Sequence, residues 1–336
     1  SLFSQAQQGL VTSKAMVVSA REEASAIGAD IIKQGGNAFD AMIATQLALA
    51  VAYPYAGNIT GGGFLVYRLA DGKTGTLDFR ERAPLAATKN MFLDANGNVI
   101  PNASTETGLS VGVPGAVAGI FEVHKKFGSL PIDKIFAPAI ALAEKGVVVT
   151  EKQLKQINAN KQDIVKLNGD KTLYSTAIKI GDTLKYPTLA ATLKRISKNG
   201  RNEFYKGETA KKLLGYLKSK GGIMTAKDLE DYQAVWRDPL TFNYKNLKII
   251  SMAPPSSGGI CLAQIMKMIE PFHIETYRHN SEKYIQLLTE AERRSYADRN
   301  YYLGDPDFVE IPIAQLLDKN YLYKRIETFS FNKATP

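Results

Sequence analysis

The stretch from Gly57 to Pro84 constrains the fold most, because it joins a glycine turn to two short strand patterns. Phe64 to Leu69 (FLVYRL) is rich in β-branched and aromatic residues, which favour a pleated, half-buried strand. Asp71-Gly72 supplies a residue that adopts positive φ in a hairpin loop, and Thr76 to Phe79 returns as a second strand. The sequence therefore predicts an antiparallel hairpin that ends just before Arg80.

Arg80 is the main candidate for a functional residue. A guanidinium at the end of a strand presents a planar fork that binds a carboxylate through two hydrogen bonds. Gly61-Gly62-Gly63, before the first strand, has no side chains, so a ligand or another backbone segment can approach closely there. The alternative is a structural salt bridge between Arg80 and nearby Asp78 or Glu81. The spacing of the residues leaves both interpretations open.

The rest of the chain reads as mostly helical, from apolar periodicity and from capping residues. The helix over 38–51 is apolar on nearly all sides, so we expect it to be buried. A buried helix before a glycine turn and a strand pair indicates helices stacked on a sheet. The sequence also predicts a short strand over 15–20 (AMVVSA) and a second hairpin over 240–252. The other predicted helices span 21–34, 114–127, 131–145, 150–166, 187–198, 208–220, 260–268 and 281–302.

Composition excludes several classes of protein. The chain has 336 residues and a formal charge of +9, but no basic run with interleaved aromatic residues, so we expect no nucleic-acid partner. The single cysteine, Cys261, excludes an internal disulfide framework. The longest apolar run, Ala41 to Tyr53, is too short to cross a bilayer, so we expect no membrane span.

Motifs for catalysis or metal binding are weak. Gly108 to Gly112 matches GxSxG, but a polar stretch precedes it and a proline follows, which is not the context of a nucleophile elbow. His124, His273 and His279 lack metal-ligand spacing, so we expect no metal and no cofactor. Ser256-Ser257 lies between Pro-Pro and Gly-Gly, where we expect helix capping. The residues thus offer an anion-binding arginine but no convincing nucleophile or base.

Several motifs together resemble the large subunit of the γ-glutamyltransferase (γ-glutamyltranspeptidase) family. They occur in the family's order over nearly the whole chain. The matching stretches are Gln34-Gly35-Gly36-Asn37-Ala38-Phe39-Asp40-Ala41, Gly57-Asn58, Gly61-Gly62-Gly63-Phe64, Leu77-Asp78-Phe79-Arg80-Glu81, Gly112-Val113-Pro114-Gly115, Pro254-Pro255-Ser256-Ser257-Gly258-Gly259, Tyr296-Ala297-Asp298-Arg299 and Leu303-Gly304-Asp305-Pro306-Asp307-Phe308-Val309.

The resemblance implies an α+β fold, the four-layer αββα sandwich of N-terminal-nucleophile hydrolases, completed by a small subunit. Residues 1–336 would be the large-subunit part of one αββα domain that the two subunits share. Residues 1–13 would be a polar lead, and residues 329–336 a flexible tail ending at or near the autoprocessing region. The precursor would cut itself, and the new N-terminal threonine of the small subunit would be the nucleophile. No catalytic residue is therefore expected in this chain.

The resemblance also implies an enzyme that cleaves the γ-glutamyl bond of glutathione and related compounds through an acyl-threonine intermediate. The γ-glutamyl group would pass to water or to amino-acid or dipeptide acceptors, and Arg80 would hold its α-carboxylate. The location would be periplasmic or secreted, after removal of a signal peptide. Alternatives are a related acylase (a cephalosporin acylase or a poly-γ-glutamate depolymerase) or a non-catalytic anion-binding subunit.

Overall fold

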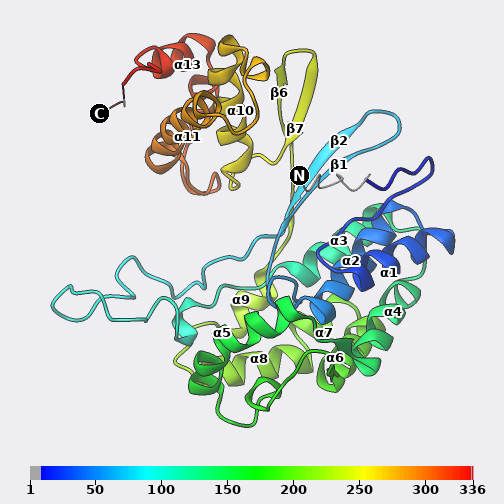
Figure 1. Ribbon diagram of the computed structural model, residues 1–336. Coiled ribbons are helices and arrows are strands. Elements are labelled where there is room, and N and C mark those ends of the chain that lie inside the picture. The colour runs from blue at the N-terminus through cyan, green and yellow to red at the C-terminus, as the bar shows by residue number, and fades with distance from the viewer. Residues whose placement is uncertain (1–8, 334, 336) are drawn as a thin grey trace. The chain divides into compact units, whose positions relative to one another are not determined.

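The computed structural model describes residues 9–333 and 335, which divide into two compact units (Figure 1). Unit 1 holds the chain up to Gly63 and from Phe79 to Ala234. Unit 2 holds Phe64–Asp78 and the chain from Val235 onward. Helices and short antiparallel strands occur together, so the predicted α+β class is confirmed. That both units belong to one domain shared with a second subunit stays a prediction.

Unit 1 is built mainly of helices. Its central helix, α2 (Ala38–Ala52), packs against α1 (Glu22–Lys33), α3 (Ala116–Phe127) and α4 (Ile132–Lys145). The short strands β3 (Val147–Val148) and β4 (Thr183–Leu184) pair antiparallel. The other elements are η1 (Gly108–Ser110), α5 (Glu151–Asn168), η2 (Leu173–Ser175), α6 (Pro187–Asn199), α7 (Arg201–Tyr205), α8 (Glu208–Ser219) and α9 (Ala226–Asp231), and η1 and η2 are 3₁₀ turns within loops.

Helix α2 begins where the sequence predicts and is buried as predicted. Asn37 Oδ1 accepts hydrogen bonds from the amides of Phe39 (2.8 Å) and Asp40 (3.1 Å), and Asp40 Oδ2 accepts one from the Asn37 amide (3.0 Å). This reciprocal capping box satisfies amides that a helix leaves without partners at its start. Ile43 and Leu47 are almost fully buried, so the helix forms the core of unit 1.

Unit 2 contains the predicted hairpin, whose strands are β1 (Phe64–Arg68) and β2 (Thr74–Asp78). The two strands pair antiparallel, with Phe64 opposite Asp78, and β2 also pairs with β5 (Val235–Arg237). The second predicted hairpin is confirmed as β6 (Leu240–Tyr244) and β7 (Leu247–Ser251), turning at Lys245 with φ 51°. The helical elements are α10 (Gly258–Ile269), η3 (Glu270–Phe272), η4 (Ile274–Thr276), α11 (Glu282–Tyr302), α12 (Ile313–Leu316) and α13 (Lys319–Ile326).

Helices α10, α11 and α13 enclose an apolar cluster in unit 2 that includes Leu287 and Ala291. Phe329 and Phe331 pack against this cluster, each in edge contact with Phe272. The rings of Phe329 and Phe331 thus have an apolar surface to cover, and a flexible tail over 329–336 stays a prediction. Residues 334 and 336 lie outside the described residues, as do Ser1 and most of the predicted polar lead over 1–13.

The strand predicted over Ala15 to Ala20 is absent from the described structure. Its backbone has no ladder partner among the described residues, and a strand needs one to satisfy its amides and carbonyls. Val18 is correspondingly 80% exposed. The β-branched composition was a sound local signal, but local preference does not supply a neighbouring strand.

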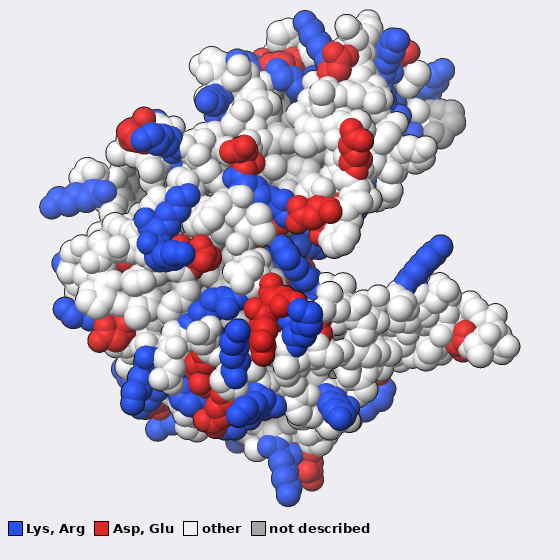
Figure 2. Space-filling model, turned by 180° about the vertical axis from the view of Figure 1, so that it is seen from behind, with Lys and Arg blue, Asp and Glu red and all other residues white. Residues whose placement is uncertain are grey.

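The surface carries both signs of charge. Figure 2 shows lysine and arginine side chains interspersed with acidic ones over the face in view. Among the described residues no helix combines the length and apolarity needed to cross a bilayer. Cys261 is buried in α10 as a free thiol.

Candidate functional site

Arg80 follows directly on a short extension of the hairpin ladder. The Gly63 amide donates to the Phe79 carbonyl (3.2 Å), and the Phe79 amide donates to the Gly63 carbonyl (3.0 Å). Phe79 itself is buried, whereas Arg80 is exposed. The chain thus leaves the ladder at Arg80, as the sequence predicts, and its side chain is accessible in this chain.

The glycine turn lies against the backbone that carries Arg80. A Cβ on Gly62 would stand 2.6 Å from the Phe79 carbonyl oxygen and 2.8 Å from the Glu81 amide nitrogen. Real Cβ atoms do not approach other atoms so closely, so only glycine fits at this position without a shift of the chain. The prediction that another backbone segment approaches Gly61-Gly62-Gly63 is confirmed.

The start of α3 also contacts the glycine turn and the backbone before Arg80. The Gly61 carbonyl accepts hydrogen bonds from the amides of Gly115 and Ala116, both at 2.9 Å. A Cβ on Gly115 would stand 2.0 Å from the Phe79 carbonyl oxygen. Two residues beyond Arg80, Arg82 exchanges two backbone hydrogen bonds with Val113, at 3.2 and 2.7 Å. The backbone on both sides of Arg80 is therefore fixed.

Tyr232 fixes the carbonyl group of Arg80 itself. Its hydroxyl donates to that oxygen at 2.8 Å, and the side chain is buried. The Tyr232 ring stacks on Tyr205, with ring centroids 5.9 Å apart and planes inclined by 9°. The Arg82 guanidinium lies 5.6 Å from the Tyr232 ring centroid. Because a stacked, buried ring has little rotational freedom, this hydrogen bond restricts the backbone at Arg80.

The Tyr205 hydroxyl extends this support to α3. It donates to the Pro114 carbonyl at 2.8 Å and accepts from the Ala118 amide at 3.1 Å. Burial raises the pKa of Tyr205, so its hydroxyl stays protonated and able to donate at neutral pH. Tyr205 and Tyr232 therefore connect the start of α3 to the backbone of Arg80.

A buried carboxylate holds the chain after Arg82. Asp228 Oδ1 accepts from the Leu85 amide (2.6 Å), and Oδ2 accepts from the amide (2.7 Å) and hydroxyl (2.6 Å) of Thr225. Burial alone would raise the pKa of Asp228, but these hydrogen bonds outweigh burial and hold the pKa below its ordinary value. Asp228 thus stays charged, and its hydrogen bond to Leu85 connects the start of the long loop over residues 83–112 to α9.

The two acidic neighbours suggested as partners of Arg80 have other contacts. Asp78 forms an ion pair with Arg237 Nε at 3.0 Å in unit 2. Glu81 lies over the glycine turn, with Oε2 2.8 Å from where a Cβ of Gly62 would be. A hollow of about 330 Å³ lies between α5 and the segment after α2, and Arg80 is not among its lining residues. A role for Arg80 in carboxylate binding stays a prediction.

The other candidate motifs have structural roles. Ser110 lies in the 3₁₀ turn η1 and donates its hydroxyl to the Thr107 carbonyl at 2.8 Å, which is not a nucleophile elbow. Ser256 Oγ accepts from the Gly258 amide at 3.2 Å, so it does contact the start of α10. Ser257 occupies the N-cap position but makes no capping hydrogen bond, and its hydroxyl accepts from Arg299 Nε at 3.0 Å. No cluster of His, Cys, Asp or Glu in the described part of the chain could hold a metal.

The sequence did not lead to Tyr232, and close packing at Gly115 was not predicted from it. Tyr232 lies 152 residues after Arg80 and belongs to no matched motif, so no local signal connects the two. Gly115 ends the matched Gly112-Val113-Pro114-Gly115 stretch, which was a usable signal of close packing. Its neighbours could be identified only from the folded chain.

Comparison with known proteins gives consistent results. A family model described as Gamma-glutamyltranspeptidase matches residues 24–336. A glutathione hydrolase proenzyme from Pseudomonas sp. (strain A14) is 44% identical over 313 residues, which are 92% of this chain and 54% of that protein. An acylase ACY 1 proenzyme from Pseudomonas sp. (strain V22) is 34% identical over 331 residues, 96% of this chain and 59% of that protein.

The solved structure of Helicobacter pylori gamma-glutamyltranspeptidase matches with a TM-score of 0.94 at 40% identity, covering 97% of this chain and 95% of that chain. The chain thus spans about half the length of the curated proenzymes that it matches, but nearly all of a chain in this solved structure. The fold, the matched length and the sequence identity agree: the chain belongs to the gamma-glutamyltranspeptidase family.

Proposed function

We propose that this chain is the large-subunit part of a γ-glutamyltransferase, or glutathione hydrolase. In the active protein a small subunit from the same precursor completes a four-layer αββα sandwich and supplies an N-terminal threonine as nucleophile. The free amine of that threonine is the general base. The enzyme acts without a metal or cofactor, in the periplasm or outside the cell.

Two coverage values support the large-subunit assignment. This chain covers 54% of a glutathione hydrolase proenzyme at 44% identity. It covers 95% of a chain in the solved gamma-glutamyltranspeptidase structure from Helicobacter pylori. A precursor that is cut into two chains accounts for both values.

The observation that carries the substrate assignment is the fixed backbone around Arg80. Gly62 and Gly115 pack against the Phe79 carbonyl, and Tyr232 bonds the Arg80 carbonyl, so the exposed guanidinium extends from a rigid base. We assign it to the α-carboxylate of the γ-glutamyl group, through a bidentate charge-assisted contact. Anchoring that end of the substrate leaves the γ-carbonyl carbon for the threonine hydroxyl.

In the reaction, the threonine hydroxyl adds to the γ-carbonyl carbon and its proton passes to the threonine amine. The amide C–N bond then breaks as that proton is delivered to the leaving nitrogen, which releases cysteinylglycine when glutathione is the substrate. The acyl-threonine ester then reacts with water, which releases glutamate, or with the amine of an amino acid or dipeptide, which forms a new γ-glutamyl amide. This chain's contribution is to bind and orient the donor.

The test uses the complete precursor. Incubation should produce two chains, and the smaller should begin with threonine by N-terminal sequencing. The processed protein should hydrolyse glutathione much faster than a glutaryl amide that lacks the α-amino and α-carboxyl groups. A preference for the glutaryl substrate would favour the acylase alternative. An uncut precursor without activity would contradict the proposal.

A further inference from the structure

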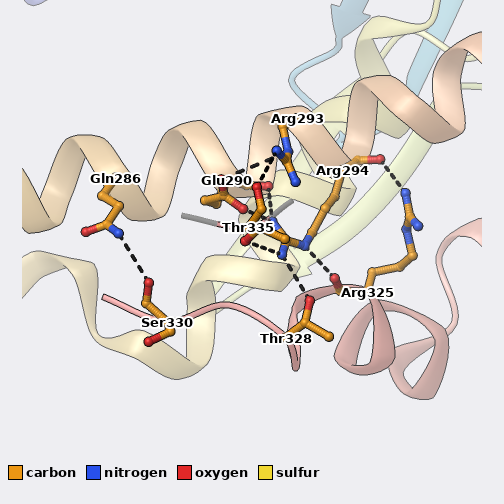
Figure 3. A network of polar contacts seen from close by, with 8 residues as sticks. All are labelled: Gln286, Glu290, Arg293, Arg294, Arg325, Thr328, Ser330 and Thr335. Carbon is orange, nitrogen blue, oxygen red and sulfur yellow. Dashed lines mark hydrogen bonds and ion pairs between the residues drawn. The ribbon is translucent and has the colours of Figure 1, made fainter. Parts of the chain in front are cut away.

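Arg294 on α11 is a buried arginine whose guanidinium contacts the last described part of the chain (Figure 3). Its Nε donates to the Arg325 carbonyl, at the end of α13, at 2.6 Å. Its Nη2 donates to the hydroxyls of Thr328 (3.2 Å) and Thr335 (3.3 Å). One side chain therefore holds three points of the segment over 325–335.

Glu290 balances the charge of Arg294 one helical turn earlier. Arg294 Nη1 forms an ion pair with Glu290 Oε2 and also donates to the Glu290 carbonyl at 3.0 Å. Burial would raise the pKa of Glu290, but hydrogen bonds from Arg294 and Thr335 outweigh it and hold the pKa low. A buried guanidinium is tolerated only when it is paired and hydrogen-bonded, and both conditions are met here.

Neighbouring residues of α11 hold the same segment. Gln286 Nε2 donates to the Ser330 carbonyl at 3.2 Å, and Arg293 Nη1 donates to the Thr335 carbonyl at 3.1 Å (Figure 3). Between these polar contacts, Phe329 and Phe331 pack on Phe272. The described residues of this segment, 328–333 and 335, have no helix or strand of their own, so these contacts with α11 and with Phe272 hold them in place.

We propose that Arg294 is a positioning residue for maturation: it anchors Thr328 and Thr335 on α11 and so restricts the segment that leads to the cleavage junction. This inference rests on the proposed function, in which the precursor continues past Pro336 to a small-subunit region. An anchored segment samples fewer conformations, so its far end spends more time near one place.

The self-cleavage step that Arg294 would assist needs water as its only co-reactant. The threonine hydroxyl at the junction adds to the carbonyl carbon of the preceding residue, and the C–N bond breaks as the nitrogen takes up the hydroxyl proton. The resulting ester is hydrolysed by one water molecule. The products are a carboxylate on the first chain, after loss of a proton, and a free amine and hydroxyl on the threonine.

The experiment follows the conversion of purified precursor into two chains over time, well below the melting temperature of every variant. Arg294→Gln should slow conversion by about tenfold, the effect expected when a charge-assisted hydrogen bond that positions the segment is lost. Thr328→Val, which changes only the tail, should slow it by roughly threefold. Glu292→Gln, an exposed charge change on the same helix, should leave the rate unchanged.

The double variant separates positioning from general damage. If Arg294 acts through Thr328, adding Thr328→Val to Arg294→Gln should slow conversion little further, because the shared contact is already lost. Once processed, each variant should show the wild-type kcat/KM for glutathione. Conversion of both single variants within about twofold of wild type, or fully additive effects in the double variant, would overturn the inference. A wild-type precursor that never converts would instead refute the proposed function, and the inference with it.

Discussion

The hydroxyl of Tyr232 donates a hydrogen bond to the carbonyl oxygen of Arg80 at 2.8 Å, although 152 residues separate them in the sequence. A backbone carbonyl held in this way determines where the attached side chain starts. The proposed substrate contact of Arg80 therefore depends on a residue that does not itself need to touch the substrate. This relationship gives the first two predictions.

Replacing Arg80 should impair donor binding. In the processed enzyme, Arg80→Ala should lower kcat/KM for glutathione by roughly 30- to 1,000-fold, since a charge-assisted bidentate contact contributes about 2–4 kcal/mol to transition-state binding. Most of the loss should appear as a higher KM. Arg80→Lys should also be poor, because an ammonium group cannot reproduce the planar fork. Steady-state kinetics measure both, and an unchanged kcat/KM for the alanine variant would remove Arg80 from the site.

Removing the Tyr232 hydroxyl should act on the same parameter more weakly. Tyr232→Phe keeps the stacked ring but leaves the Arg80 carbonyl without this donor, at a cost of about 1–2 kcal/mol in the free energy of unfolding. KM should rise several-fold, with a smaller change in kcat. Tyr323→Phe, at a side chain 65% exposed on α13, is the matched control and should behave as wild type. Equal kinetics for the two variants would show that the Arg80 carbonyl needs no such support.

Adding one methyl group at Gly115 should destabilise the protein. The new Cβ would stand 2.0 Å from the Phe79 carbonyl and 2.2 Å from the Tyr232 hydroxyl, so backbone must move. We expect Gly115→Ala to lose about 1–3 kcal/mol in the free energy of unfolding. Gly215→Ala, on α8 with open space around it, should gain about 0.5–1 kcal/mol from helix propensity. Urea unfolding of both variants tests the pair, and a stable Gly115→Ala protein would contradict the close packing.

The charge of Asp228 should make stability depend on pH. Its pKa is lower in the folded protein than its ordinary value of 3.8, so the carboxylate stabilises the fold above that pH. This contribution is lost as the pH falls through the lower, folded-state pKa. Asp228→Asn should therefore be less stable than wild type at neutral pH, and the difference should shrink below about pH 4.

Asp231→Asn is the control for this prediction. Asp231 pairs with Lys227 at 2.6 Å on the exposed side of α9, and surface pairs of this kind contribute little. Its unfolding free energy should follow that of wild type across the same pH range. If the difference in unfolding free energy between Asp228→Asn and wild type stays constant from neutral pH down to about pH 3, Asp228 does not cause the pH dependence of stability.

The sequence predicts elements whose causes are local. The capping box at Asn37 and Asp40, the hairpin that ends before Arg80 and the turn at Lys245 depend on residues within a few positions of each other. All the residues that form these elements lie within the local sequence, so the predicted boundaries agree with the observed ones to within one or two residues.

What the sequence does not predict depends on distant contacts. Residues 15–20 have strand composition but no neighbouring strand, and Ser257 lies at an N-cap position but bonds Arg299 instead. The support of Arg80 by Tyr232 is the clearest example for the site, since nothing near Tyr232 in sequence indicates an anion-binding residue. The position of Arg80 at the end of the strand follows from the local sequence, whereas the residues that hold its backbone do not; its role in carboxylate binding stays a prediction.

The two hydrogen bonds between Arg82 and Val113 close the base of the long loop that runs between them. In Figure 1 this loop extends from the body of unit 1. Because its two ends are fixed to each other, insertions or deletions between them change the loop's closure entropy only slowly with length and leave the base in place. Changes of length or composition within this loop should therefore leave the backbone beside Arg80 undisturbed.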